Sequence, residues 1–132
     1  MIFVDASFFL AYYNINDVHH EKAKTHWTDI EAGKYGQHFT SDYILNEVVG
    51  VTLRKLGKKP AIMIGRQLLE SVIILNIDDH LLLEAWRIFE NTQFNFNLVG
   101  CTNLVTMKIL NADNIATFDK EFSEIKNIYV IK

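Results

Sequence analysis

Short apolar runs alternate along the chain with longer stretches in which apolar residues recur every three or four positions. The short runs predict buried strands at residues 2–5, 37–40, 72–77, 114–118 and 128–131. The helical spacings predict helices at residues 7–13, 17–31, 43–56, 61–70, 80–91 and 99–110. Strands interleaved with helices of this length are typical of a mainly parallel sheet that is covered by helices on both faces. The pattern therefore predicts an α/β fold.

Polar residues and glycines indicate where several of these elements begin and end. The segment 57–60, which reads Gly-Lys-Lys-Pro, predicts a turn between two helices. Either Ser41 or Asp42 is expected to cap the predicted helix 43–56. Either Asp78 or Asp79 is expected to cap the predicted helix 80–91. These signals fix the boundaries to within a few residues.

Composition narrows the class of protein. A chain of 132 residues with 49% hydrophobic and 22% charged residues predicts one globular domain spanning 1–132. The net charge of −3 argues against bulk electrostatic capture of nucleic acid, although a local basic patch is compatible with it. The single cysteine, Cys101, permits no internal disulfide and is expected to be a small buried residue. Without a signal peptide or an apolar run of about 20 residues, the sequence predicts a cytoplasmic protein.

Two aspartates directly follow predicted strands. Asp5 ends the first apolar run, and Asp119 follows Thr117 and Phe118 at the end of another. Ligands of open α/β sheets bind outside the carboxyl ends of the strands, so two carboxylates there suggest a divalent metal site. Each aspartate is equally suited to cap a following helix, and both roles can hold at once. Ser7, two residues after Asp5, is placed to orient a ligand or a water.

Glu47 lies near the border of the apolar stripe on the predicted helix 43–56, beside Ile44, Val48 and Val51. A carboxylate in such a place is expected to be paired or ligated, because burying an isolated charge is costly. The alternatives are a metal ligand and an ion pair with a neighbouring lysine or arginine.

A basic cluster lies at the end of the same helix. Arg54, Lys58 and Lys59 belong to it. Cations at a helix C-terminus offset the helix dipole, which is one explanation of the cluster. Contact with RNA phosphates is the other. The histidines form no HExxH pattern, and the chain contains no Walker A loop and no GxGxxG element.

Several segments in order along the chain resemble the PIN domain family, and within it the VapC-type toxins of prokaryotic toxin–antitoxin pairs. The matching segments are Ile2–Ser7, Asn16–Ala23, Thr40–Glu47, Val99–Met107 and Ala116–Phe122. Each segment alone is a weak signal, but all of them at these separations are fairly specific.

The resemblance implies a three-layer α/β/α sandwich and a ribonuclease that depends on Mg²⁺ or Mn²⁺. Carried over by position, Asp5, Glu47 and Asp119 would be metal ligands, and Ser7 would help to orient the site. A further acidic ligand is expected directly before Cys101, where this chain has Gly100. Mg²⁺ usually takes one or two carboxylates together with waters and phosphate oxygens.

Gly100 has three interpretations: a natural loss, an inactivating change in a harmful toxin, or a register that is wrong by one turn. The first two imply an impaired nuclease, unless a water or Asn103 substitutes for the missing oxygen. The alternative function is an inactive module that binds an antitoxin or RNA.

The resemblance also implies an RNA substrate and a cognate antitoxin. The apolar surface of the predicted helix 80–91, with Leu83, Trp86 and Phe89, suggests a homodimer.

Overall fold

The computed structural model describes residues 1–93 and 95–132. Within these residues the chain forms a five-stranded sheet in the order β3-β2-β1-β4-β5, and all neighbouring strands run parallel. The strands are β1 (Ile2–Val4), β2 (His38–Ser41), β3 (Ile73–Leu75), β4 (Asn114–Ala116) and β5 (Tyr129–Ile131). The strand that begins the chain therefore lies at the centre of the sheet.

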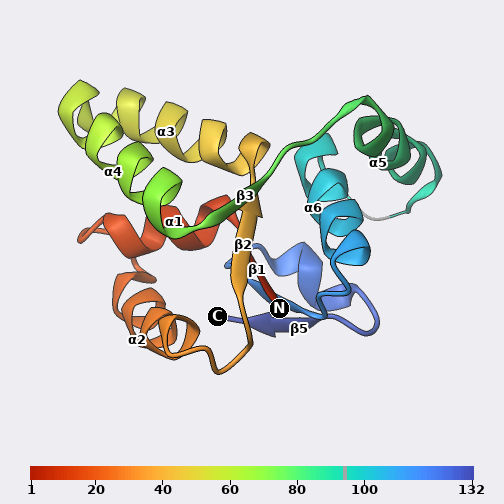
Figure 1. The fold of residues 1–132 in the computed structure, drawn as a ribbon, viewed down its shortest axis with the longest axis horizontal. Coiled ribbons are helices and arrows are strands. Elements are labelled where there is room, and N and C mark those ends of the chain that lie inside the picture. The colour runs from red at the N-terminus through yellow and green to blue at the C-terminus, as the bar shows by residue number, and fades with distance from the viewer. Residues whose placement is uncertain (94) are drawn as a thin grey trace.

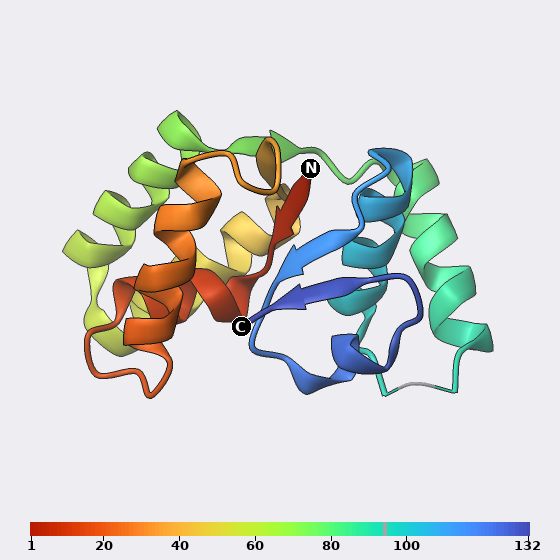
Figure 2. The same cartoon turned by 90° about the horizontal axis from the view of Figure 1, so that it is seen from below.

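Helices cover both faces of this sheet (Figures 1 and 2). The group on one face consists of α1 (Ala6–Tyr13), α2 (His20–Glu31), α3 (Asp42–Leu56) and α4 (Lys58–Ser71). The group on the other face consists of α5 (Asp79–Asn91) and α6 (Leu98–Ile109). A 3₁₀ helix, η1 (Lys120–Glu124), connects β4 to β5. The molecule is thus a three-layer α/β/α sandwich with a parallel central sheet, as the sequence predicts.

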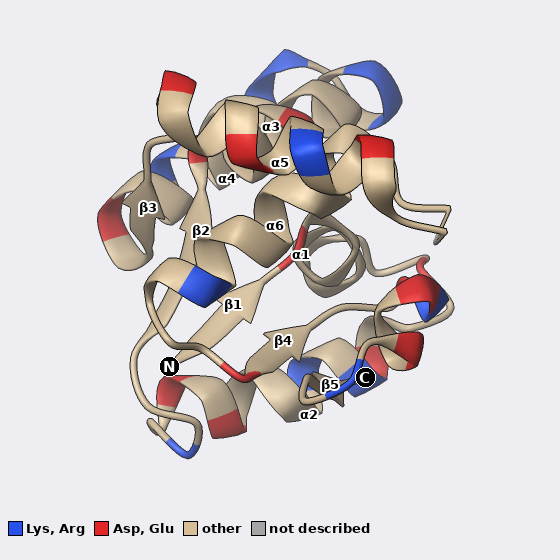
Figure 3. Cartoon of the chain, turned by 90° about the vertical axis from the view of Figure 1, so that its right-hand side faces the viewer, with Lys and Arg blue, Asp and Glu red and all other residues tan. Residues whose placement is uncertain are grey.

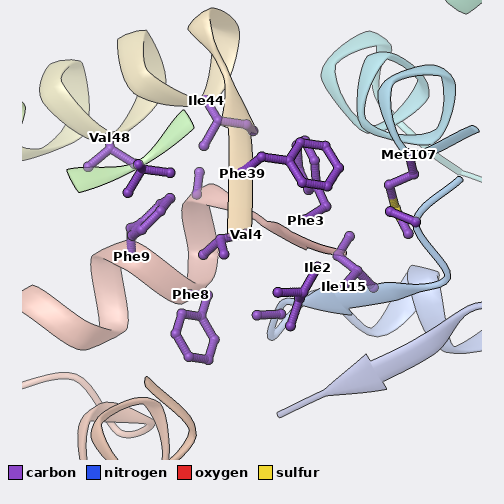
Figure 4. Close-up of a cluster of buried hydrophobic side chains, with 14 of the residues drawn as sticks. Ile2, Phe3, Val4, Phe8, Phe9, Phe39, Ile44, Val48, Met107 and Ile115 are labelled. Carbon is purple, nitrogen blue, oxygen red and sulfur yellow. The ribbon is translucent and has the colours of Figure 1, made fainter. Parts of the chain in front are cut away.

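The core lies on both faces of the central strands, against α1 and α3 on one side and against α6 on the other. Ile2, Phe3 and Val4 of β1 are fully buried, because a central parallel strand is covered on both faces. Figure 4 shows their side chains together with those of Phe8 and Ile115, among others. This packing fixes the end of β1, and hence the residue that follows it, relative to the helices.

Every predicted strand and helix is present, with three differences in detail. The helix predicted from residue 17 begins at His20. The predicted turn at 57–60 is wrong: only Gly57, with a φ of 96°, separates α3 from α4. Lys58 to Pro60 instead form the first turn of α4, where proline is tolerated because its missing N–H has no helical partner anyway. The 3₁₀ helix η1 is not anticipated by the sequence pattern.

The structure decides between the alternative helix caps. Ser41 Oγ accepts a hydrogen bond of 3.3 Å from the Ile44 N–H, and Asp78 Oδ1 accepts one of 2.9 Å from the Leu81 N–H. Asp42 accepts instead from the Ile77 N–H at 3.1 Å, which ties α3 to the segment after β3. In the described part of the chain, no helix is both long and apolar enough to span a membrane.

Candidate metal centre

The candidate centre lies at the carboxyl ends of the two central strands, β1 and β4. These strands pair in parallel with Val4 opposite Ala116, so the residues that follow them leave the sheet at the same edge. The Asp5 N–H donates to the Ala116 carbonyl at 3.0 Å, which continues the pairing by one residue. The arrangement places polar side chains from two segments more than a hundred residues apart beside each other.

Asp5 is buried, with 8% of its surface exposed, and its carboxylate is held by three side chains. Oδ2 accepts from Ser7 Oγ at 2.7 Å and from Thr117 Oγ1 at 2.8 Å, while Oδ1 accepts from Asn103 Nδ2 at 3.1 Å. Asp5 stands at the N-cap position of α1, but its side chain makes no capping hydrogen bond. The capping interpretation is therefore wrong for its side chain, which is directed to neighbouring side chains instead.

Ser7 joins α1 to the loop after β4. Its hydroxyl donates to Asp5 and accepts from the Phe118 N–H at 3.0 Å. The Thr117 hydroxyl lies 3.0 Å from Ser7 Oγ and accepts from the Asp119 N–H at 3.0 Å. Ser7 thus helps to position both aspartates. Thr117 shares this work, and sequence reasoning missed it, although its place directly after a buried strand was a usable signal.

Glu47 projects from α3 and is exposed, but it contributes to the same pocket as Asp5. The pKa of its carboxyl is raised, first by desolvation and then by the negative charge of Asp5. Within the described residues, none of the ion pairs involves Glu47. The alternative of an ion pair with a neighbouring lysine or arginine is therefore wrong.

Asp119 is the third carboxylate of the pocket. It is exposed, and its Oδ1 accepts from the Glu121 N–H at 3.0 Å, so it caps η1 as one interpretation of the sequence predicts. This capping bond occupies only one of the two carboxylate oxygens.

One open pocket of about 180 Å³ brings these groups together. Its lining includes the three predicted carboxylates, Ser7, and three residues of α6 or its cap: Asp5, Ser7, Glu47, Asn97, Gly100, Asn103 and Asp119. Gly100 thus faces the pocket at the position where the resemblance expects an acid, which argues against a register error. Arg54, Lys58 and Lys59 are not among the lining residues.

Gly100 is buried in the first turn of α6. Its N–H donates to Asn97 Oδ1 at 2.8 Å, which caps the helix. A Cβ atom at position 100 would lie 2.9 Å from Phe96 Cδ1, closer than packed carbon atoms approach. The Phe96 ring in turn packs against Phe122 with ring centroids 4.9 Å apart. The aromatic pair therefore occupies part of the space that a side chain at position 100 would need.

The residues of the pocket fit a hard divalent cation. Its lining offers carboxylate, hydroxyl and carboxamide oxygens, and hard cations such as Mg²⁺ prefer oxygen ligands. Asp5 and Glu47 are close enough to raise the pKa of Glu47, and two carboxylates are a usual complement for Mg²⁺. Among the described residues, no group of three or more His, Cys, Asp or Glu side chains is gathered closely enough to hold a metal. Of the three carboxylates that line the pocket, Asp5 and Glu47 are the two whose charges interact.

Comparisons with known proteins agree with this geometry. The protein is an α/β/α sandwich whose pocket carboxylates include those that follow its central strands β1 and β4. The PIN domain model matches residues 2–128, and the chain belongs to the PIN domain family. Mycobacterium tuberculosis VapC20, a protein named as a 23S rRNA-specific endonuclease, is 29% identical over 125 residues, which are 93% of this chain and 92% of VapC20.

Solved structures show the same fold. The crystal structure of Mycobacterium tuberculosis VapC20, described as a sarcin–ricin loop cleaving toxin, superposes with a TM-score of 0.83 at 28% identity over 93% of each chain. VapBC2 from Rickettsia felis, bound to a DNA fragment from its promoter, gives a TM-score of 0.74 at 15% identity over 98% of this chain and 97% of that one. The likeness to VapC-type toxins that the sequence suggests is confirmed.

Proposed function

We propose that this protein is a metal-dependent endoribonuclease and the toxin of a toxin–antitoxin pair. The observation that carries the proposal is the pocket at the carboxyl ends of β1 and β4. Asp5, Glu47 and Asp119 line it, and none of them has an ion-pair partner among the described residues. Carboxylates that converge without a cation repel one another, so the arrangement is best explained by a bound divalent ion.

Asp5, Glu47 and Asp119 would hold Mg²⁺ or Mn²⁺. When bound, such an ion polarises the scissile phosphate and lowers the pKa of an attacking water. Ser7 and Thr117 both donate to Oδ2 of Asp5 and so hold its carboxylate in one orientation. Water is the nucleophile in this proposal, and it attacks the phosphate in line with the leaving oxygen.

Arg54 is the strongest of the basic candidates for RNA contact. It lies seven residues after Glu47 on α3, which places both on one face about 10 Å apart along the axis. A Cβ atom at Gly50 would lie 3.5 Å from Arg54 Nη1, so the guanidinium extends back over Gly50 towards Glu47. An RNA phosphate next to the cleaved one is a suitable partner for it. Lys58 and Lys59, in the first turn of α4, are more distant candidates.

The substrate we propose is an RNA loop within a structured ribosomal RNA. Support comes from VapC20, whose name and crystal structure specify 23S rRNA and the sarcin–ricin loop. Single-stranded loops also offer unstacked bases, which are the usual target of sequence-specific RNA recognition.

An antitoxin that covers the pocket, a homodimer and a cytoplasmic location complete the proposal. A chain of the Klebsiella pneumoniae toxin–antitoxin complex has the same fold, with a TM-score of 0.73.

Gly100 is expected to weaken the activity, because the position faces the pocket and supplies no side-chain oxygen. Loss of even an outer partner of a metal ligand lowers affinity or activity by roughly 10–100-fold. The same residue favours the second candidate function, an inactive PIN module that binds RNA or an antitoxin. The retained carboxylates favour the enzyme.

Cleavage of ribosomal RNA by four versions of the chain tests the proposal. These are the protein itself, Gly100→Asp, Asp5→Asn, and Asp113→Asn as a control at an exposed site outside the pocket. With Mn²⁺ or Mg²⁺ we expect slow cleavage by the protein and faster cleavage by Gly100→Asp. The control Asp113→Asn should cleave at the same rate as the protein. Asp5→Asn should not cleave, and a chelator should abolish cleavage by every version. Absence of cleavage by both the protein and Gly100→Asp would support the inactive module instead.

A further inference from the structure

Asn103 is the one buried side chain of the described residues whose polar atom has no hydrogen-bond partner. It belongs to α6, it is 1% exposed, and it lines the acidic pocket. Its Nδ2 donates to Asp5 Oδ1 at 3.1 Å, while its Oδ1 accepts from no described group. Buried oxygens are rarely left in this state, because the lost hydration is then not replaced.

The orientation of this carboxamide is fixed by its neighbour. Asp5 Oδ1 is an acceptor when the carboxylate is ionised, so the Asn103 side chain must present its nitrogen to it. Turning the amide over would bring two oxygens together and lose the bond. Oδ1 therefore stays next to the carboxylate group and without a donor, as an oxygen ligand of a cation would.

Position 103 lies one helical turn after Gly100. Residues three apart on a helix share a face, so both positions are directed to the pocket, and both line it. At Gly100 the space is restricted by the Phe96 ring, 2.9 Å from where a Cβ would stand. Asn103 thus carries a side-chain oxygen one turn after position 100, on the same face of α6.

We propose that Asn103 supplies, through Oδ1, a neutral oxygen ligand to the divalent cation held by Asp5 and Glu47, in place of the acid that position 100 lacks. The inference rests on the proposed metal site. Carboxamide oxygens are ordinary ligands of hard cations, but they add no charge. One ligand of the cation is therefore an uncharged amide, and the cation is held more weakly than by a site in which position 100 also supplies a carboxylate.

Mn²⁺ affinity, measured by titration calorimetry on the full chain without RNA, tests this role. We expect Asn103→Ala to weaken binding by about 10-fold or more, as losses near a metal do. Asn103→Asp is expected to bind Mn²⁺ more tightly than the protein itself, because it keeps the oxygen and adds a charge. Thr106→Val, which removes a buried hydroxyl of α6 outside the pocket, is the control and should leave affinity unchanged.

The aspartate variant separates a ligand from a side chain that only orients Asp5. Both substitutions of Asn103 remove the N–H that donates to Asp5. If orientation were the whole role, Asn103→Asp would weaken Mn²⁺ binding at least as much as Asn103→Ala, and that result would overturn the inference. Mn²⁺ binding that the substitution Asp5→Asn leaves unchanged would instead overturn the proposed metal site itself.

A spectroscopic measurement covers the case in which the variants do not fold. Protein containing asparagine with a ¹³C-labelled carboxamide is loaded with Mn²⁺ and examined by pulsed EPR. The Asn97→Ser background keeps a helix cap and removes the other pocket asparagine. A hyperfine coupling from a carbon two bonds away from Mn²⁺ is expected, and bound Mn²⁺ without that coupling would exclude Asn103 as a ligand.

Discussion

At the scale of single residues, the site contains one carboxylate that is held and one that is free. Asp5 accepts three side-chain hydrogen bonds, whereas Glu47 faces the charge of Asp5 and forms none of the ion pairs among the described residues. The first arrangement fixes the geometry of the carboxylate that we propose as a metal ligand. The second stores electrostatic repulsion that a cation would relieve.

The raised pKa of Glu47 predicts how stability depends on pH without metal. A carboxyl whose folded pKa lies above its unfolded value of about 4.5 destabilises the folded state once it is ionised. This contribution is absent below that value and develops as the pH rises through the folded pKa. We therefore expect Glu47→Gln, measured by thermal unfolding in a chelator, to raise the Tm at neutral pH and to leave it unchanged near pH 4.

Two comparisons make this prediction specific. Glu124→Gln removes one negative charge from the exposed surface of η1 and should leave the Tm nearly unchanged. Mn²⁺ should reverse the order of stability, because the ion favours ionised Glu47 and cannot bind well to glutamine. A stabilisation by Glu47→Gln that persisted at acidic pH would show that charge is not its cause.

Ser7 offers a prediction about stability. Ser7→Ala removes a donor to Asp5 and an acceptor for the Phe118 N–H, so a partly buried carboxylate and a backbone group lose partners. Leaving such groups unpaired costs about 1–3 kcal/mol. Urea unfolding should show a loss of that size for Ser7→Ala. For Ser123→Ala, which removes an exposed hydroxyl that accepts from Lys132, the change should be within about 0.5 kcal/mol. Equal changes in the two variants would contradict the prediction.

At the scale of elements, the sequence predicts the fold best where a strand is short, apolar and buried on both faces. The run Ile2–Val4 shows this: it has no polar residue, and the structure buries all of it. The place of Asp5 and Asp119 followed from the same logic, since both end such runs. The limits of the turn at 57–60 did not follow, because glycine, lysine and proline are compatible with a turn and with the first turn of a helix.

The partners of the site residues were not predictable from the sequence. That Asp5 would bind Asn103 and Thr117 depends on how α6 and β4 pack beside β1, over separations of about a hundred residues. No local pattern encodes such contacts. The same holds for Gly100: its place in the pocket was expected from the resemblance, but the nearness of the Phe96 ring is a matter of tertiary packing.

Two helical glycines give opposite predictions for the same substitution. Alanine is favoured over glycine in a helix by up to about 1 kcal/mol. At Gly50 the added Cβ would meet only Arg54 Nη1, at an ordinary 3.5 Å, so Gly50→Ala should stabilise the protein. At Gly100 the Cβ would lie 2.9 Å from the packed ring of Phe96, and overpacking of this kind costs roughly 1–3 kcal/mol. We expect urea unfolding to show a net loss for Gly100→Ala; a gain at both sites would show that Phe96 moves freely.

At the scale of the whole molecule, charge is distributed unevenly despite a net charge of only −3. Lys and Arg gather where α3 meets α4 (Figure 3), whereas Glu47, the pocket carboxylate on α3, lies in the first half of that helix. A polyanion bound along α3 would therefore find a positive group at one end and a cation-dependent site towards the other. This polarity favours a local RNA contact over general attraction to nucleic acid.

The exposed apolar surface of α5 predicts the oligomeric state. Leu83, Trp86 and Phe89 are 60%, 45% and 41% exposed, and a hollow of about 570 Å³ lined by Leu82, Leu83, Trp86 and Leu98 lies beside them. A two-fold dimer requires a patch that complements itself, and a ridge of large side chains next to an apolar hollow meets that requirement. Light scattering should therefore give the mass of a dimer, and Trp86→Glu should give the 15.3 kDa monomer. Leu69→Glu, at an apolar site on α4 that is 63% exposed, should remain dimeric. A monomer for the unmodified chain at every concentration would remove the homodimer from the proposal.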